Sequence, residues 1–145
     1  MSGTAGISKN THDSATALVV GEGERPWSEN ELTEVRARLE TEIAELVAEI
    51  SRAESEIAAR LTDSVGDAGD DTADVGAKTY QREHELALTH NARELLAQNE
   101  RALNRMADGT YGICESCGNP IGKARLQAFP RATLCVQCKQ REERR

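Results

Sequence analysis

The sequence predicts a mainly α-helical protein, in which a long antiparallel coiled-coil hairpin precedes a small module with four cysteines and a short C-terminal helix. Three observations predict this architecture. Apolar residues recur at helical spacing over two long stretches, a segment rich in Gly and Asp separates them, and every cysteine lies in the last 32 residues. Aromatic residues make up 3% of the chain and charged residues 30%, which suits long solvated helices better than a conventional globular core.

The start of the first helix carries clear local signals. Residues 1–26 mix small, polar and charged side chains without periodicity, so we expect them to form a disordered tail. Ser28 and Glu31 stand at the spacing of a capping box, in which each side chain accepts a hydrogen bond from the other's backbone N–H. Trp27 can pack on Leu32 as a hydrophobic staple, so the helix is predicted to begin near residue 29.

Over residues 29–62, the apolar positions follow steps of three and four and keep one seam for more than four heptads. Such a helix cannot bury its seam alone. The seam consists of Leu32, Val35, Leu39, Ile43, Leu46, Ile50, Ala53, Ile57 and Leu61.

A second helical stretch, predicted near residues 74–107, supplies the partner, and Asp108-Gly109 forms its stop. The two stretches have matched lengths and are joined by an acidic tip near residues 63–76, so an antiparallel hairpin over 27–109 is favoured over two separate oligomerising coils. We therefore expect a monomer. The side chains expected to face inward are Tyr80, Leu88, Leu95, Ala102 or Leu103, and Met106.

The four cysteines follow the pattern C-x2-C-x17-C-x2-C within residues 110–145. Two C-x2-C pairs offer the tetrahedral thiolate cage of one structural Zn²⁺, which leaves no position for water or substrate. Two disulfides are the alternative, but they require an oxidising compartment, and no secretory signal is visible at the N-terminus. The predicted ligands are Cys114, Cys117, Cys135 and Cys138, and the expected location is cytoplasmic.

Charge and motif content limit the function. The net charge is −7, with 22 acids against 11 bases in residues 1–109 and 3 against 7 in residues 110–145. Most of the chain would repel nucleic acid, so a protein partner is favoured over direct DNA binding. No segment approaches the length of a membrane span. His84 and His90 have no matched base or nucleophile, so an enzyme is not expected.

The cysteine module resembles the DksA/TraR zinc-finger family. The similar residues are Tyr111 to Gly118, Pro120-Ile121-Gly122, Arg125-Leu126, Ala128, Pro130, Thr133-Leu134-Cys135 and Cys138-Lys139. The resemblance implies a bacterial transcription regulator that binds RNA polymerase directly. It further implies that a coiled-coil tip enters the secondary channel of the polymerase and alters initiation, often together with the alarmone ppGpp.

At the tip, the family pattern resembles Asp-x-x-Asp-x-Ala, which places the effector positions of this chain at Asp71, Asp74 and Gly76. Both carboxylates are kept, whereas Gly replaces Ala and loosens the start of the second helix. By the same resemblance, the basic residues of an alarmone pocket match Gln98, Phe129 and Lys139. Only Lys139 is basic, so we expect little or no ppGpp synergy.

Two other classes of function stay open at this point. One is a structural zinc adaptor or coiled-coil interaction protein that does not act on polymerase. The other is a redox sensor, because zinc thiolates can be oxidised with release of the metal.

Overall fold

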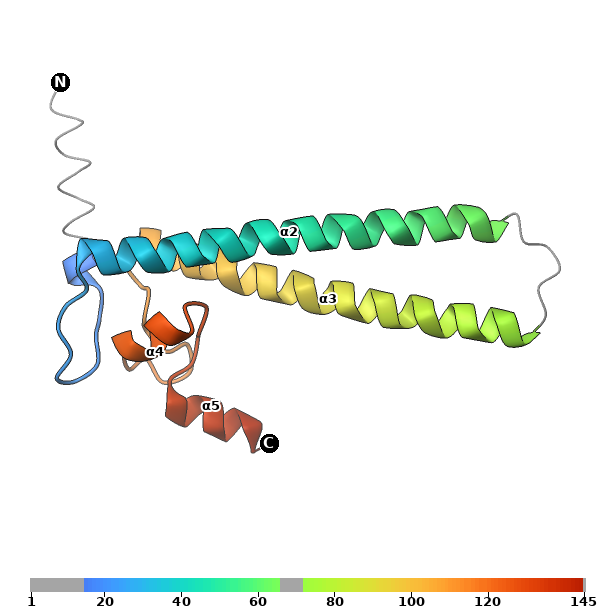
Figure 1. The fold of residues 1–145 in the computed structure, drawn as a ribbon. Coiled ribbons are helices and arrows are strands. Elements are labelled where there is room, and N and C mark those ends of the chain that lie inside the picture. The colour runs from blue at the N-terminus through green and yellow to red at the C-terminus, as the bar shows by residue number, and fades with distance from the viewer. Residues whose placement is uncertain (1–14, 66–71, 145) are drawn as a thin grey trace, which may run out of the picture. The chain divides into compact units, whose positions relative to one another are not determined.

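The computed structural model describes residues 15–65 and 72–144, which are mostly helical (Figure 1). The only β-pairing within those ranges is an isolated antiparallel bridge between Ile113 and Pro120. The mainly α-helical class is therefore confirmed. The helices are α2 (Glu29–Val65), α3 (Thr72–Asp108), α4 (Lys123–Ala128) and α5 (Val136–Glu143).

The chain divides into two compact units whose limits differ from those expected from the sequence. The first unit combines residues up to Thr41 with those from Gln98 onward, and the second spans Glu42–Ala97. The expected division separated a hairpin over 27–109 from a cysteine module over 110–145. The difference arises because the first turns of α2 and the last turns of α3 share one buried cluster with the cysteine module.

The buried cluster of the first unit is built from four segments of the chain. Trp27 and Tyr111 are its largest members, with ring centroids 6.0 Å apart. Two of the cysteines are part of the same cluster, so these metal ligands share their buried packing with the helices. The cluster contains Ala15, Leu18, Trp27, Leu32, Val35, Leu39, Ala102, Met106, Tyr111, Cys114, Ile121, Leu126 and Cys138.

The start of α2 has the predicted capping box. The backbone N–H of Ser28 donates to Oε1 of Glu31 at 2.9 Å, and the backbone N–H of Glu31 donates to Oγ of Ser28 at 3.1 Å. Trp27 and Leu32 are both buried in the first unit's cluster, as the staple requires. These contacts satisfy two of the N–H groups that a helix start leaves without intrahelical partners.

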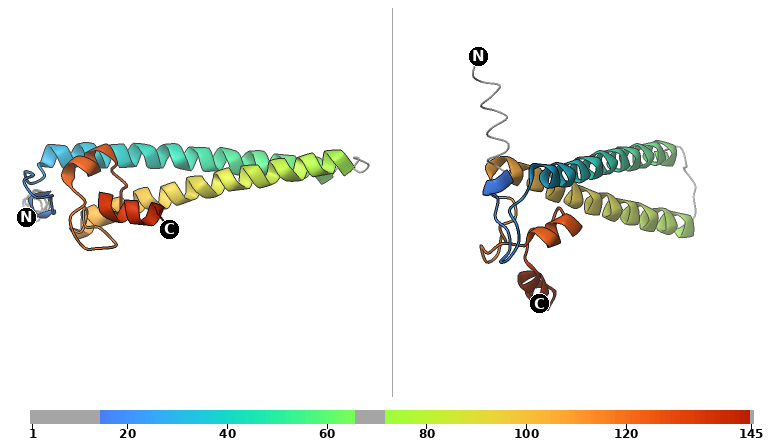
Figure 2. Two further views of the ribbon diagram at one scale, coloured as in Figure 1. Left: turned by 90° about the horizontal axis from the view of Figure 1, so that it is seen from below. Right: turned by 60° about the vertical axis from the view of Figure 1, so that its left-hand side comes forward.

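In the second unit, the facing parts of α2 and α3 run antiparallel (Figure 2). Leu46 and Ile50 pack with Ala92, and two ion pairs, Arg60 with Glu85 and Glu54 with Arg93, join the helices. As the residue numbers rise along α2, those of the partners on α3 fall, which is the register of an antiparallel hairpin. The predicted hairpin is present in this unit.

The seam predicted for α3 is confirmed toward the C-terminal end of the helix, where Ala102 and Met106 are buried and Leu95 packs against a buried cluster, but not at Tyr80 and Leu88. Tyr80 and Leu88 are 74% and 53% exposed, whereas Thr89, Ala92 and Asn99 are buried. In the half of α3 that contains Tyr80 and Leu88, the prediction followed the larger apolar side chains, but the buried residues Thr89 and Ala92 are polar or small. Short side chains suit these positions because they let two helices approach closely, and the larger apolar residues then lie on other faces of α3.

The expected disordered tail over residues 1–26 does not hold for its second half. Residues 15–26 are part of the first unit, and Ala15 and Leu18 are buried in its cluster. The apolar pattern in this segment is too short to show periodicity, but a few side chains suffice to pack against a core that other segments supply. Residues 1–14 lie outside the described part of the chain.

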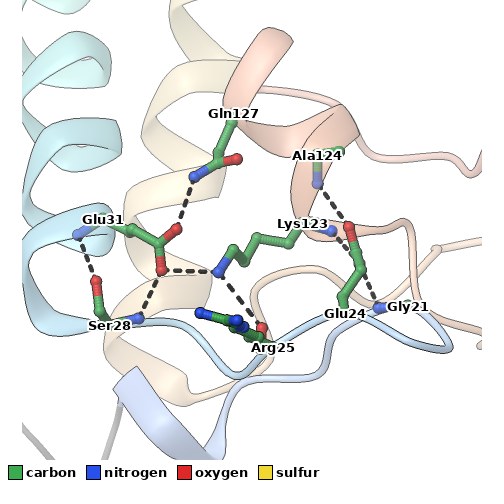
Figure 3. Close-up of polar contacts among 8 residues, drawn as sticks. All are labelled: Gly21, Glu24, Arg25, Ser28, Glu31, Lys123, Ala124 and Gln127. Atoms are coloured by element: carbon green, nitrogen blue, oxygen red, sulfur yellow. Dashed lines mark hydrogen bonds and ion pairs between the residues drawn. The ribbon is translucent and has the colours of Figure 1, made fainter.

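The first turn of α2 is joined to α4 through Glu31 (Figure 3). Its carboxylate accepts hydrogen bonds from Nζ of Lys123 at 2.7 Å and from Nε2 of Gln127 at 3.2 Å. Lys123 Nζ also lies 5.8 Å from the centroid of the Trp27 ring. The carboxylate that caps α2 therefore also positions α4, a second role that sequence spacing alone does not reveal.

Candidate metal centre

The first cysteine pair lies on a tight turn stabilised by backbone hydrogen bonds. The N–H of Gly118 donates to the carbonyl of Cys114 at 3.0 Å, and the N–H of Cys114 donates to the carbonyl of Asn119 at 2.9 Å. Gly118 has a φ of 76°, a conformation that glycine adopts without steric cost. The turn thereby presents Cys114 and Cys117 on one side, and we call residues 113–120 the first knuckle.

The second cysteine pair is positioned by the start of α5. Cys135 is the N-cap residue, and Cys138 follows within the first turn of the helix. The N–H of Glu115 donates to the carbonyl of Thr133 at 2.9 Å, which ties the first knuckle to the chain just before α5. The backbone therefore brings both pairs to one place.

The four sulfur atoms fit one tetrahedral metal ion. All four lie within 4.8 Å of one another, and Sγ of Cys117 is 3.8 Å from Sγ of Cys135. A tetrahedron with Zn–S bonds of ~2.3 Å has sulfur–sulfur edges of about 3.8 Å. That separation is far longer than the ~2.05 Å bond of a disulfide, so the disulfide alternative is not supported. Cys114, Cys117, Cys135 and Cys138 form the site for one structural Zn²⁺.

The environment of Cys114 favours the thiolate form that zinc requires. Burial raises the pKa of its thiol, but the backbone N–H groups of Cys117, Cys135 and Ser116 outweigh burial and lower the pKa to about 6. The N–H of Cys135 lies 3.4 Å from Sγ of Cys114. One donor at the start of α5 therefore helps the first knuckle's own N–H groups to hold negative charge on the sulfur. With four thiolates bound, the ion has no open position, so its role is structural.

Side chains of α3 support the first knuckle from outside the metal site. Arg105 donates to the carbonyl of Ile113 at 3.2 Å and to Oε1 of Glu115 at 2.5 Å, and Arg101 lies 3.5 Å from the same carboxylate oxygen. The knuckle is thus fixed to the last turns of α3 by charge-assisted hydrogen bonds. Nothing in the spacing of the cysteines indicates these contacts.

The predicted tip residues are only partly within the described part of the chain. Asp71 lies outside it, and the backbone of Asp74 is in α3. Gly76 is an exposed residue of α3, and a Cβ added there would meet no atom within 4 Å. The backbone at Gly76 is therefore helical and open to solvent.

The three residues assigned to a vestigial alarmone pocket do come together. Gln98, Phe129 and Lys139 line one pocket of about 480 Å³, and Phe129 is 57% exposed. Arg125 and Arg131 also line this pocket, and the guanidinium of Arg125 lies 5.6 Å from the centroid of the Phe129 ring. The acidic side chains of Glu142 and Glu143 share the lining and offset part of this positive charge.

Comparison with known proteins identifies the family. The family model of the prokaryotic dksA/traR C4-type zinc finger matches residues 109–144. The solved structure of transcription factor DksA2 from Pseudomonas aeruginosa is 33% identical, with a TM-score of 0.63, and the alignment covers 80% of this chain and 85% of that one. The chain belongs to the DksA/TraR family. The metal site is therefore the C4-type zinc finger of that family, with its four cysteines as ligands.

Two curated relatives in the DksA/TraR family carry a functional name. The RNA polymerase-binding transcription factor DksA of Caulobacter vibrioides is 44% identical over 75 residues, which is 52% of this chain and 53% of that protein. The protein of the same name from Escherichia coli is 39% identical over 69 residues, or 48% of this chain and 46% of that protein. The chain thus spans about half the length of the curated relatives it matches. None of the helices in residues 15–65 and 72–144 combines the length and hydropathy needed to cross a membrane.

Proposed function

We propose that this DksA/TraR protein is a transcription regulator that binds RNA polymerase directly. The observation that carries the proposal is the similarity to a solved DksA2 structure over most of both chains, together with curated relatives named for polymerase binding. The closed four-cysteine site agrees with a binding protein whose metal stabilises a surface and takes no part in a reaction.

The proposed effector is the tip of the hairpin, inserted through the secondary channel of the polymerase. Asp71 and Asp74 are its acting carboxylates, and Gly76 follows them in α3. The segment between residues 61 and 77 has five aspartates and no base, so it would be attracted to a cationic channel wall or a Mg²⁺-bearing centre. On this proposal, the tip forms only part of the surface that contacts polymerase. A variant with a changed tip can then still bind polymerase while it loses the effect on initiation.

Weak or absent synergy with ppGpp is part of the proposal. The pocket that contains Gln98, Phe129 and Lys139 presents one basic residue at those three positions. Arg125 and Arg131 add positive charge nearby, but Arg125 is engaged with the Phe129 ring and donates to the carbonyl of Leu134 at 3.3 Å. A highly charged phosphate ligand gains most from several unengaged Arg and Lys side chains, so this pocket is poorly supplied for it.

The test is transcription in vitro with the cognate polymerase. Asp71→Asn combined with Asp74→Asn should abolish the effect on initiation while co-purification with polymerase persists. Asp67→Asn combined with Asp70→Asn is the matched control, because it removes the same charge from the same tip and should keep most of the effect. Adding ppGpp should change the activity of the wild type little.

Each part of the proposal has its own contrary outcome. Failure to co-purify with polymerase would remove the proposed partner and favour a structural adaptor. Full activity in the Asp71/Asp74 variant would remove the acidic-tip mechanism. A large response to ppGpp in the wild type, lost on Lys139→Ala, would show that the pocket still takes the alarmone.

A further inference from the structure

Residues 15–25, which we call the N-terminal strap, pack against the zinc finger although about 90 residues separate them in sequence. Ala15 and Leu18 are buried in the same cluster as the zinc ligands Cys114 and Cys138. The strap therefore shares its apolar packing with the metal site. The cysteine motif gives no indication of this contact, because the strap lies far outside it.

The strap lies close to the backbone on both sides of the first knuckle, just before it and just after it. Before the knuckle, a Cβ on Gly112 would lie 3.4 Å from the carbonyl oxygen of Val19 and 3.5 Å from its Cγ2. After the knuckle, a Cβ on Gly21 would lie 3.6 Å from the Cα of Gly122. The two sides of the knuckle are also joined to each other, because the N–H of Ile121 donates to the carbonyl of Gly112 at 2.7 Å. The strap thus lies along the base from which the knuckle projects.

Glu24 fastens the strap with hydrogen bonds to backbone donors (Figure 3). Its Oε1 accepts from the N–H of Gly21 at 2.6 Å and from the N–H of Lys123 at 2.7 Å, while Oε2 accepts from the N–H of Ala124 at 2.9 Å. The N-cap of α4, Gly122, makes no side-chain cap hydrogen bond of its own. Glu24 therefore supplies the cap of α4 from almost 100 residues away.

Charge strengthens this fastening. Hydrogen bonds from Ala124 and Lys123 are the main cause that lowers the pKa of Glu24, so the carboxylate is ionised near neutral pH. A carboxylate at the start of a helix is also favoured by the helix dipole. Charge-assisted hydrogen bonds of this kind are stronger than neutral ones.

We propose that the N-terminal strap is a metal-coupled clasp, whose docking on the finger and the binding of zinc at the four cysteines strengthen each other. The strap holds Gly112 and Gly122 in place, and the knuckle between them carries Cys114 and Cys117. Groups that position metal ligands from outside the first coordination shell contribute strongly to metal affinity. By thermodynamic linkage, the factor by which the docked strap tightens zinc binding is the factor by which zinc tightens strap docking.

The first arm of the test measures zinc release from the full chain to a chromogenic chelator. Glu24→Gln keeps the size of the side chain, but it removes the charge and turns one acceptor oxygen into a donor that faces a backbone N–H. We expect zinc to leave about 10-fold faster than from the wild type. Glu22→Gln is the matched control, since it makes the same change at an exposed position of the strap and should leave the rate unchanged.

The second arm measures amide hydrogen exchange of residues 15–25 with zinc bound and after its removal. We expect the strap to lose protection when zinc is removed, while residues 46–58 of α2, in the second unit, keep theirs. Glu24→Gln with zinc bound should show part of the same loss, and Glu22→Gln should not.

Two results would overturn the proposal. Equal rates of zinc release from the wild type and Glu24→Gln would show that the strap does not influence the metal site. Protection of the strap that survives zinc removal would show that its docking is independent of the metal. Neither result depends on polymerase, so the clasp can fail while the proposed function stands.

Discussion

Glu31 and Lys123 form an ion pair, with Nζ of Lys123 2.7 Å from Oε1 of Glu31, that links the first turn of α2 to the first turn of α4. The same carboxylate closes the capping box with Ser28. One side chain therefore serves a local role, which the sequence predicts, and a long-range role, which it does not. Local spacing identifies a capping box because both partners lie within one turn, whereas the Lys123 contact depends on the fold.

Acid should weaken the first unit through Glu31. The hydrogen bond from Lys123, followed by that from the Ser28 N–H, lowers the pKa of Glu31 from 4.5 to about 2. A carboxyl group whose pKa is lowered in the folded state contributes its full stabilisation to the fold at pH values above its pKa in the unfolded chain. This contribution is lost as the pH falls from about 4.5 to about 2. Glu31→Gln should lower the free energy of unfolding by about 1 kcal/mol at pH 7. The loss is modest because the side chains of Glu31 and Lys123 are both partly exposed, so solvent screens their attraction.

The measurement is urea unfolding followed by the fluorescence of Trp27, the only tryptophan, which lies in the first unit. The difference between the wild type and Glu31→Gln should shrink as the pH falls below about 4. Glu34→Gln, on an exposed position of the same helix, should match the wild type at every pH. A difference that persists undiminished at pH 2 would show that the charge of Glu31 is not the cause.

The periodicity of α2 predicts its buried face, and two leucines on that seam test how far the burial extends. Leu39 is 1% exposed in the first unit, whereas Leu61 is 41% exposed in the second. Leu39→Ala should cost about 2–5 kcal/mol in unfolding free energy because it leaves a cavity. Leu61→Ala should cost less than about 1 kcal/mol, because little apolar area is lost there. Chemical denaturation followed by circular dichroism measures both variants. A similar loss of unfolding free energy in Leu39→Ala and Leu61→Ala would mean that the seam is also packed around Leu61 in solution.

How much of the fold follows from sequence depends on the strength of each local signal. The seam of α2 repeats over many turns, so its face and its start at Glu29 are predictable. On α3 the buried residues include the polar Thr89 and Asn99, which no apolar pattern selects, and Tyr80 competes for the assignment although it is exposed. The register of a weakly apolar helix is decided by its partner, so it cannot be read from that helix alone.

The metal ligands were fully predictable because their type and spacing carry the chemistry. The surrounding support was not, because Glu24, Lys123 and Arg105 are ordinary charged residues in sequence and gain their roles only when distant segments meet. Only part of the Glu24 contacts is local, because its side chain also accepts a hydrogen bond from the N–H of Gly21, three residues earlier.

Loss of the zinc site should unfold the first unit and spare the second. Cys117→Ser removes one of four ligands, and structural zinc supplies much of the folding energy of small zinc domains. The unfolding free energy reported by Trp27 should fall by more than about 4 kcal/mol, and zinc measured by elemental analysis should drop well below one ion per chain. Gln137→Ser introduces the same side chain at an exposed position that is not a ligand, and it should keep the metal. Retention of one tightly bound zinc by Cys117→Ser would contradict a site that needs all four thiolates.

Glycine-to-alanine substitutions at Gly76 and Gly109 should have opposite effects on stability. Gly76 lies within α3 in open space, so Gly76→Ala should stabilise the helix by about 0.5–1 kcal/mol, because alanine loses less conformational entropy on folding. Gly109 follows the end of α3 with a φ of 82°, where alanine is strained, so Gly109→Ala should destabilise by about 1 kcal/mol or more. Thermal unfolding followed by circular dichroism at 222 nm measures both variants.

Gly76→Ala also tests the proposed tip. If the acidic tip acts on polymerase, the stiffer helix start in Gly76→Ala should increase the effect on initiation with little change in polymerase affinity. An unchanged transcriptional effect in a variant that is measurably more stable would show that the backbone at Gly76 does not limit the action of the tip.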